Sequence, residues 1–207
     1  MTLSINKQKE KDWDSLIKQV AKTNGWKFKS WFAYKEINNF FYEITFYTSG
    51  FDNSLRGSLQ FKPLIIDEVF WEIVGLGDNK KMPLSFRGNG AFVIRSKNVF
   101  DFNQKIIPET LKIDINILFS KINNQVDTLQ STITDLDNFV RYLEQNPDDE
   151  NEWFDSDLKI MSLIIQKNYD KVFSLLDYAK KEEKVCSFGF GDKDFYDLAK
   201  EFCDNQI

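Results

Sequence analysis

The sequence contains no histidine among its 207 residues. Because catalytic triads and many metal sites depend on imidazole, this absence excludes Ser-His-Asp and Cys-His nucleophilic sites and histidine-based metal sites. The only cysteines, Cys186 and Cys203, do not form a CxxC pair. Two thiols cannot complete a four-ligand zinc site unless carboxylates or another chain contribute. We therefore expect no metal and no cofactor, and we expect reduced, buried thiols rather than a disulfide.

The sequence also lacks a long apolar run. Its first residues, 1–14, contain no apolar signal-peptide core, and no later stretch approaches the ~18 apolar residues of a membrane helix. These absences predict a cytoplasmic protein without a membrane partner.

The composition that is present is typical of a folded domain. Hydrophobic residues make up 42% of the chain, and aromatic residues, including 20 phenylalanines, make up 15%. A chain of this length and composition can bury a sizeable core, which disfavours intrinsic disorder. It is long enough for one large domain or two small ones.

Charge is distributed unevenly between the two halves. Residues 1–100 hold 15 basic and 10 acidic residues, whereas residues 101–207 hold 12 basic and 22 acidic residues. The first half therefore carries a net charge of +5 and the second a net charge of −10. This asymmetry predicts either that the halves complement each other or that the acidic half faces a basic partner.

Residues 1–100 have the pattern of an α+β half. A helical period ends at Asn24-Gly25, a left-handed stop signal, and a second helix is predicted from Pro63 to Val74. Alternating apolar residues separated by short turns predict a four-stranded antiparallel sheet, with strands over 26–35, 40–48, 55–62 and 91–95.

Residues 101–207 have the pattern of a helical half of four to five helices. The apolar period slips at Asn123-Asn124, so residues 109–145 form either one kinked helix or an antiparallel hairpin, and typical helix lengths favour the hairpin. Further helices are predicted over 157–167 and 169–181, and a last one after an N-cap at Asp192. The fold class is therefore α+β, with the helical half packed on the first half as one compact unit.

An acidic stretch runs from Glu144 to Asp157 without a basic residue. It lacks the ligand frame of a calcium loop. The simplest interpretation is a solvated connection between helices whose aromatic residues enter the core. The functional interpretation is a docking surface for a basic protein, in which carboxylates speed association and an aromatic residue anchors the partner. The candidate partner-binding residues are Asp148, Asp149, Glu150, Glu152, Trp153, Asp155 and Asp157.

A basic and aromatic sheet face is the second candidate surface. Strand parity gathers Lys27, Lys29, Lys35, Arg56, Gln60 and Lys62 there, near Trp31, Phe41 and Tyr47. Such interleaving can bind a nucleic-acid backbone and stack on bases. We favour the alternative that the acidic half covers this face, so nucleic acid is not an expected partner.

One catalytic arrangement needs no imidazole. Asp52 followed by Gln60-Phe61-Lys62 resembles the PD-(D/E)xK pattern of Mg²⁺-dependent nucleases, with Glu43 standing in for the missing second carboxylate. This alternative function requires Asp52, Glu43 and Lys62 to meet in one cleft.

Several segments resemble a known group of proteins. They are Asn24-Gly25-Trp26-Lys27, Phe40-Phe41-Tyr42-Glu43, Ser58-Leu59-Gln60-Phe61, and Gly189-Phe190-Gly191 ahead of Phe195-Tyr196. Their order, mainly within residues 10–100 and the last 20 residues, is similar to that of bacterial α+β domains of unknown function, some of them immunity-type proteins. The resemblance implies a bacterial protein-binding domain and carries no catalytic motif.

These observations predict a non-enzymatic domain, an immunity-like inhibitor that docks a basic partner through its acidic surface. The heptad spacing in 109–145 leaves open a homodimer, although it favours packing within the chain.

Overall fold

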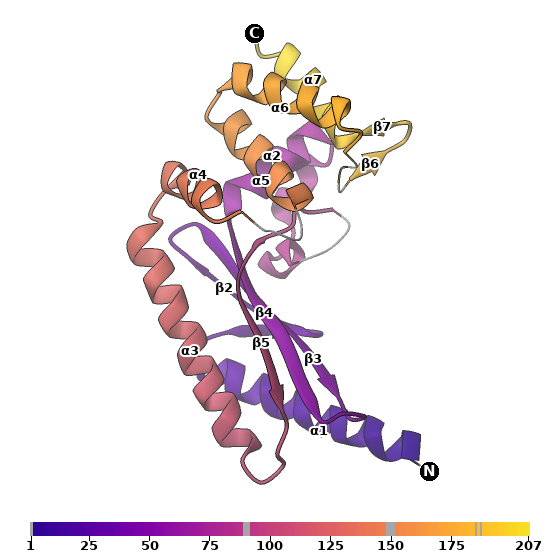
Figure 1. The fold of residues 1–207 in the computed structure, drawn as a ribbon, viewed down its shortest axis with the longest axis vertical. Coiled ribbons are helices and arrows are strands. Elements are labelled where there is room, and N and C mark those ends of the chain that lie inside the picture. Colours follow the sequence, from indigo (N-terminus) through magenta and orange to yellow (C-terminus); the bar gives the residue numbers. More distant parts are fainter. Residues whose placement is uncertain (1, 89–91, 148–151, 185, 187) are drawn as a thin grey trace. The chain divides into compact units, whose positions relative to one another are not determined.

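A computed structural model describes residues 2–88, 92–147, 152–184, 186 and 188–207, without the side chains of residues 2–5, 152–156 and 190. The fold is α+β (Figure 1). Its helices are α1 (Thr2–Thr23), α2 (Leu64–Ile73), α3 (Leu111–Thr132), α4 (Leu136–Gln145), α5 (Glu152–Ile165), α6 (Tyr169–Lys181) and α7 (Phe195–Asp204). Short 3-10 helices span η1 (Gly77–Lys81) and η2 (Leu84–Arg87).

The main sheet has five antiparallel strands in the order β1-β2-β3-β4-β5, one more than the sequence predicts. They are β1 (Lys27–Lys29), β2 (Phe32–Ile37), β3 (Phe40–Ser49), β4 (Ser54–Pro63) and β5 (Lys97–Lys105). A second, two-stranded sheet pairs β6 (Gly189–Phe190) with β7 (Lys193–Asp194). The extra strand arises because the predicted strand 26–35 folds back at Ser30, which has a φ of 55°, so that Lys29 pairs with Phe32.

The chain divides into two compact units. The first unit contains Met1–Phe61 and Asn98–Thr132, and the second contains Lys62–Lys97 and Ile133–Ile207. These units differ from the predicted halves 1–100 and 101–207, because β5 and α3 belong with the N-terminal sheet while α2 belongs with the later helices.

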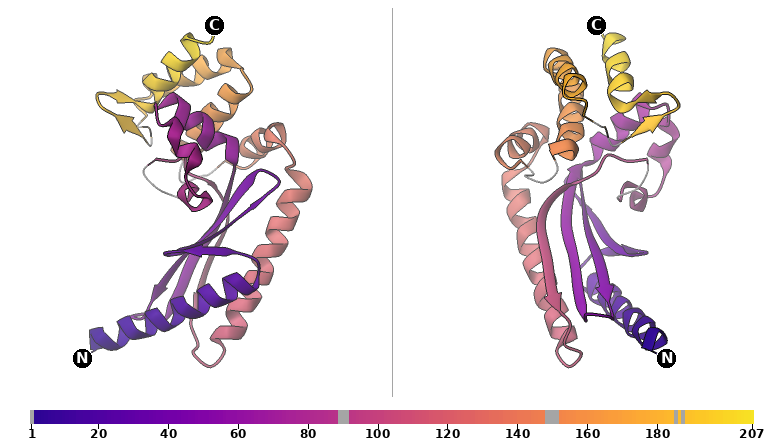
Figure 2. Two further views of the ribbon diagram at one scale, coloured as in Figure 1. Left: turned by 180° about the vertical axis from the view of Figure 1, so that it is seen from behind. Right: turned by 45° about the vertical axis from the view of Figure 1, so that its right-hand side comes forward.

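In the first unit, α1 and α3 contact each other and lie beside the sheet (Figure 1), and Figure 2 shows α1 next to β3 from two further directions. The Phe46 ring lies 5.9 Å from the Phe119 ring of α3, which places that helix on the Phe46 face. Helix α1 ends at Thr23, and the predicted glycine stop follows it at Gly25, which has a φ of 81°. The opposite sheet face is also covered in the middle of β3, since Phe41, Glu43 and Thr45 are all buried.

Helix α3 runs unbroken through Asn123, so the slip of the apolar period at Asn123-Asn124 does not end the helix. The side chain of Asn123 instead makes long-range contacts within the first unit. Its Oδ1 accepts hydrogen bonds from Trp26 Nε1 at 3.0 Å and from Lys35 Nζ at 3.2 Å. The region 109–145 does contain two helices, and the second begins after Asp135, whose Oδ1 accepts from the Asn138 amide at 2.8 Å. That hydrogen bond lowers the pKa of Asp135.

In the second unit, α5 contacts α2, α4 and α6, and α7 contacts α2 and α6 (Figure 1). This central position explains why Leu158, Met161 and Ile164 are buried. The predicted strand 91–95 is absent at its described residues, because the carbonyls of Phe92 and Ile94 accept hydrogen bonds from Trp71 and Lys62 instead of from a neighbouring strand.

The last helix is capped by Asp194 rather than by the predicted Asp192. Asp194 Oδ1 accepts from the Asp197 amide at 2.9 Å, whereas Asp192 lies in the turn between β6 and β7. We expect Asp194→Ala to lower the free energy of unfolding by about 1 kcal/mol, because a helix N-terminal amide loses its acceptor. Urea denaturation followed by circular dichroism measures this change. Asp192→Ala is the matched control and should leave the midpoint unchanged; equal losses for both variants would contradict the assignment.

Candidate functional site

Helices α4 and α5 form an antiparallel pair that carries both ends of the predicted acidic stretch. Gln166 donates a hydrogen bond to Asp137, and Lys159 Nζ lies 3.9 Å from Glu144 Oε1. Asp137 and Glu144 are seven residues apart on α4. Their partners, Gln166 directly after α5 and Lys159 within it, are seven residues apart in the opposite direction, which fixes the antiparallel alignment.

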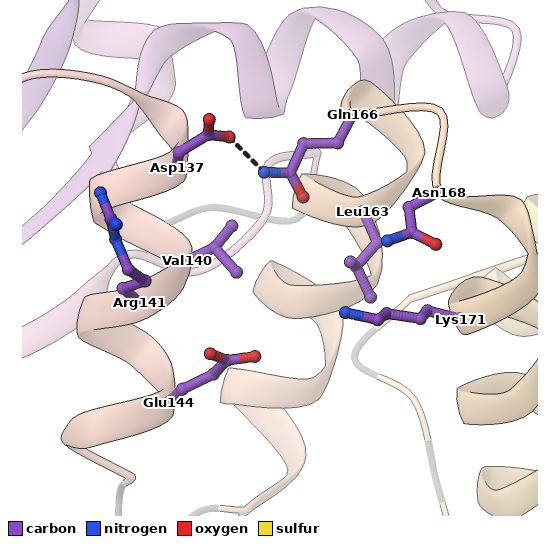
Figure 3. A pocket seen from close by; sticks show the side chains of 8 residues that line it. All are labelled: Asp137, Val140, Arg141, Glu144, Leu163, Gln166, Asn168 and Lys171. Atoms are coloured by element: carbon purple, nitrogen blue, oxygen red, sulfur yellow. Dashed lines mark hydrogen bonds between the residues drawn. The ribbon is translucent and has the colours of Figure 1, made fainter.

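A groove of about 620 Å³ lies between α4, α5 and the start of α6. Val140 and Leu163 are buried and form its apolar floor, as Figure 3 shows. Glu144 and Lys171 reach toward the groove from opposite sides in the same view. The lining residues are Asp137, Val140, Arg141, Glu144, Leu163, Gln166, Asn168 and Lys171.

The charged groups of the groove are exposed and differ in how they are bound. Arg141 Nη2 donates to Asn138 Oδ1 at 3.0 Å, whereas Glu144 has only the long contact to Lys159. Among the described residues, Lys171 makes no ion pair. Because an exposed pair at 3.9 Å contributes little to stability, Glu144 is available to an incoming cation.

The predicted docking residues have different outcomes. Asp148, Asp149 and Glu150 lie outside the described residues. Glu152, Trp153 and Asp155 fall in α5, where the backbone alone is described, so their candidacy stays a prediction.

Asp157 does not fit an exposed docking surface, since only 2% of it is exposed. Burial raises the pKa of the Tyr196 hydroxyl, and the nearby carboxylate of Asp157 raises it further. Asp157 therefore faces the interior of the second unit, next to α7.

The predicted basic sheet face is only partly present. Lys62, Gln60 and Phe41 are buried. Lys35 lies 4.2 Å above the Trp26 ring, and burial lowers its pKa. Of the basic residues, Lys27, Lys29 and Arg56 are exposed. Proteins that bind a nucleic-acid backbone do so with a continuous, positively charged groove. Three exposed cations are too few to form one.

The residues of the nuclease alternative are bound to different partners. Asp52 accepts hydrogen bonds from Ser54 Oγ and Arg56 Nη2, both at 2.7 Å, and hydrogen bonds from Ser49 and Ser54 lower its pKa to about 2. Lys62 Nζ donates to Asp67 and to the carbonyl of Ile94. Within the described part of the chain, no three acidic or cysteine side chains are grouped closely enough to bind a metal ion.

Sequence reasoning missed the groove itself. Asp137, Arg141 and Glu144 are spaced four and three residues apart, which puts them on one helix face, and this signal was readable from the sequence. Leu163, Gln166 and Lys171 could not be assigned to the same site without the α4–α5 alignment.

None of the described helices is long and apolar enough to cross a bilayer. No family model, no curated protein and no solved structure matches the chain.

Proposed function

We propose that this chain is a non-enzymatic protein-binding domain that docks a basic protein through an acidic surface. We define this acidic surface as Asp137 and Glu144 on α4 together with the carboxylates that the sequence predicts beyond them, Asp148, Asp149, Glu150, Glu152 and Asp155. The observation that carries the proposal is the exposed groove of α4, α5 and α6, which has an apolar floor and the weakly paired Glu144 at its edge.

The groove and the acidic surface have complementary roles in this proposal. Excess carboxylates attract a basic protein and raise its association rate, an effect that salt screens. The floor of Val140 and Leu163 offers an apolar side chain of the partner a place to lose water, which supplies affinity. Arg141 and Lys171 select partners that present a carboxylate at the matching position.

An immunity-like inhibitor is the specific form of this function that we propose. The similarity of several segments to immunity-type proteins supports it, as does the absence of histidine from the chain. Such a protein acts by covering a basic functional surface of its partner, so its binding should abolish the partner's activity in a one-to-one complex.

The test is affinity capture from native lysate with the intact chain and with a charge-reversed variant. In the variant, Glu144, Asp148, Asp149, Glu150 and Glu152 become lysine. We expect the intact chain to retain a basic protein, and the purified pair to bind at least about tenfold more weakly in the variant or at high salt. Fluorescence anisotropy of the purified pair measures both effects.

A matched variant reverses an equal number of exposed carboxylates elsewhere in the second unit, namely Asp170, Asp177, Glu182, Glu183 and Asp192. It has the same net charge as the test variant and should bind as the intact chain does. If both variants lose binding equally, general charge rather than this surface explains the capture. Capture of a partner that is not basic, or binding unaffected by the test variant, would reject the proposal.

A further inference from the structure

The first unit contains a cleft of about 240 Å³ that is separate from the acidic surface. It lies between α1, the turn joining β1 to β2, and the end of β3. Its volume is below the roughly 300–1,000 Å³ typical of sites for drug-sized ligands. The cleft is therefore suited to one side chain rather than to a cofactor.

Aromatic rings form one wall of the cleft. Trp31 and Tyr47 are 42% and 61% exposed, and their rings stack with centroids 6.0 Å apart. Phe28 and Phe46 stack behind them at 6.2 Å. The Phe46 amide donates to the Trp31 carbonyl at 3.2 Å, which holds the turn against β3. Two exposed rings held in this way offer a rigid face to a cation.

Two carboxylates of α1, Glu10 and Asp14, line the same cleft. Glu10 Oε1 accepts a hydrogen bond from the Gly50 amide at 2.7 Å, and Asp14 Oδ1 accepts from Thr48 Oγ1 at 2.9 Å. These bonds fix both side chains at the cleft and each occupies one oxygen. The second oxygen of each carboxylate makes no hydrogen bond within the described residues.

Within the described part of the chain, neither carboxylate takes part in an ion pair. Glu10 and Asp14 are four residues apart on one helix, a spacing at which like charges destabilise. Among the described residues, no lysine or arginine lies within 4.0 Å of either carboxylate. A cation that enters the cleft would relieve this repulsion and would face the two exposed rings.

We propose that the cleft binds an arginine side chain of a partner protein. A guanidinium stacks flat on an aromatic face while its edge donates to carboxylates, and its five donors can serve both Glu10 and Asp14. Lysine has fewer donors and no flat face, so it fits less well. This site lies in the other unit from the acidic surface and does not depend on the function proposed above.

The test follows the Trp31 indole N–H signal by NMR while N-acetyl-arginine amide is added. We expect a saturable shift of this signal, which is assigned by its loss in Trp31→Phe. The uncharged isostere N-acetyl-citrulline amide should cause no shift, and N-acetyl-lysine amide should bind more weakly than arginine. The indole signals of Trp26 and Trp71, which donate to Asn123 and to Phe92, are internal references and should not move.

Variants separate binding from a structural role of the carboxylates. Glu10→Gln and Asp14→Asn keep an acceptor oxygen for Gly50 and Thr48 but remove the charge, so each should fold and bind arginine about tenfold more weakly. Asp12→Asn, an exposed change on α1 outside the cleft, is the matched control and should bind normally.

Three results would overturn the proposal. One is no shift of the Trp31 signal up to the solubility limit of the arginine probe. Another is equal binding of arginine and citrulline. The third is the same shift on concentrating the protein alone, which would identify a second copy of the chain as the occupant.

Discussion

Gly57→Ala should destabilise the first unit by about 3 kcal/mol or more, at the upper end of the cost of overpacking. A Cβ on Gly57 would lie 1.9 Å from the Thr45 carbonyl oxygen and 2.4 Å from Cζ of Phe102. The contact with Phe102 is with the far end of a side chain, whereas the Thr45 carbonyl belongs to the backbone of β3 and cannot move without disturbing the sheet. Urea denaturation followed by far-UV circular dichroism measures the loss.

Two variants make this prediction specific. Gly77→Ala adds a Cβ that meets nothing within 4 Å, so it should leave the free energy of unfolding unchanged or slightly raise it. Combining Gly57→Ala with Phe102→Val removes the ring contact and leaves the contact with Thr45. We therefore expect the double variant to stay unstable. Recovery in that variant would show that the aromatic ring, rather than the strand backbone, requires glycine.

Local signals predicted most of the regular structure. The glycine stop after α1 and Pro63 ahead of α2 each depend on a few neighbouring residues, and the structure confirms both, as it confirms the strand predicted over 40–48. Errors arose where a distant contact decides the local structure. Asn123 looked like a helix break, yet within α3 it accepts hydrogen bonds from Trp26 and Lys35.

Strand β5 shows a second reason for error. Few of its residues are buried: Phe102 is, but its neighbours Asp101 and Asn103 are exposed. The sequence after Lys97 therefore lacks the apolar alternation of a core strand. Pairing with β4 at the edge of the sheet stabilises it instead. Such pairing depends on residues some forty positions away, and no window of a few residues contains that information.

The two proposed binding surfaces differ in how far the sequence reveals them. The acidic stretch is visible as a run of like charges, and Trp31 and Tyr47 stood out as aromatic residues near the sheet. The sequence alone does not indicate Glu10 and Asp14, because the polar face of α1 is dominated by lysine and glutamine. Only the structure shows that these two carboxylates line the same cleft as the aromatic rings. Their spacing of four residues was the one available signal.

Lys62 is the clearest case in which parity misled. Strand parity predicts it on the basic sheet face with Lys27, Lys29 and Arg56, but Lys62 and Asp67 are both fully buried, with Nζ 2.8 Å from Oδ1. Nζ also donates to the Ile94 carbonyl at 2.5 Å, and the Ile94 amide donates to Asp67 Oδ1 at 3.3 Å. Burial raises the pKa of Asp67, while Lys62 and, at 3.7 Å, Arg87 oppose that shift. This cluster ties the chain around Ile94 to α2.

We expect either single change, Lys62→Met or Asp67→Leu, to lower the free energy of unfolding by about 3–5 kcal/mol, because each leaves a buried charge without its partner. The double variant should lose about 2–3 kcal/mol less than the two single losses predict together. It will still lose the hydrogen bonds to Ile94, at about 1 kcal/mol each. A double-mutant cycle in urea measures these differences.

The exposed pair Lys81 and Asp78 is the matched control, because its side chains are 82% and 92% exposed with Nζ 2.7 Å from Oδ1. Lys81→Met and Asp78→Leu should each change stability by less than about 1 kcal/mol and should be additive. Additive losses at Lys62 and Asp67 would instead mean that each group is stabilised by its other contacts, so that the Ile94 backbone and Arg87, rather than the ion pair, hold this segment on α2.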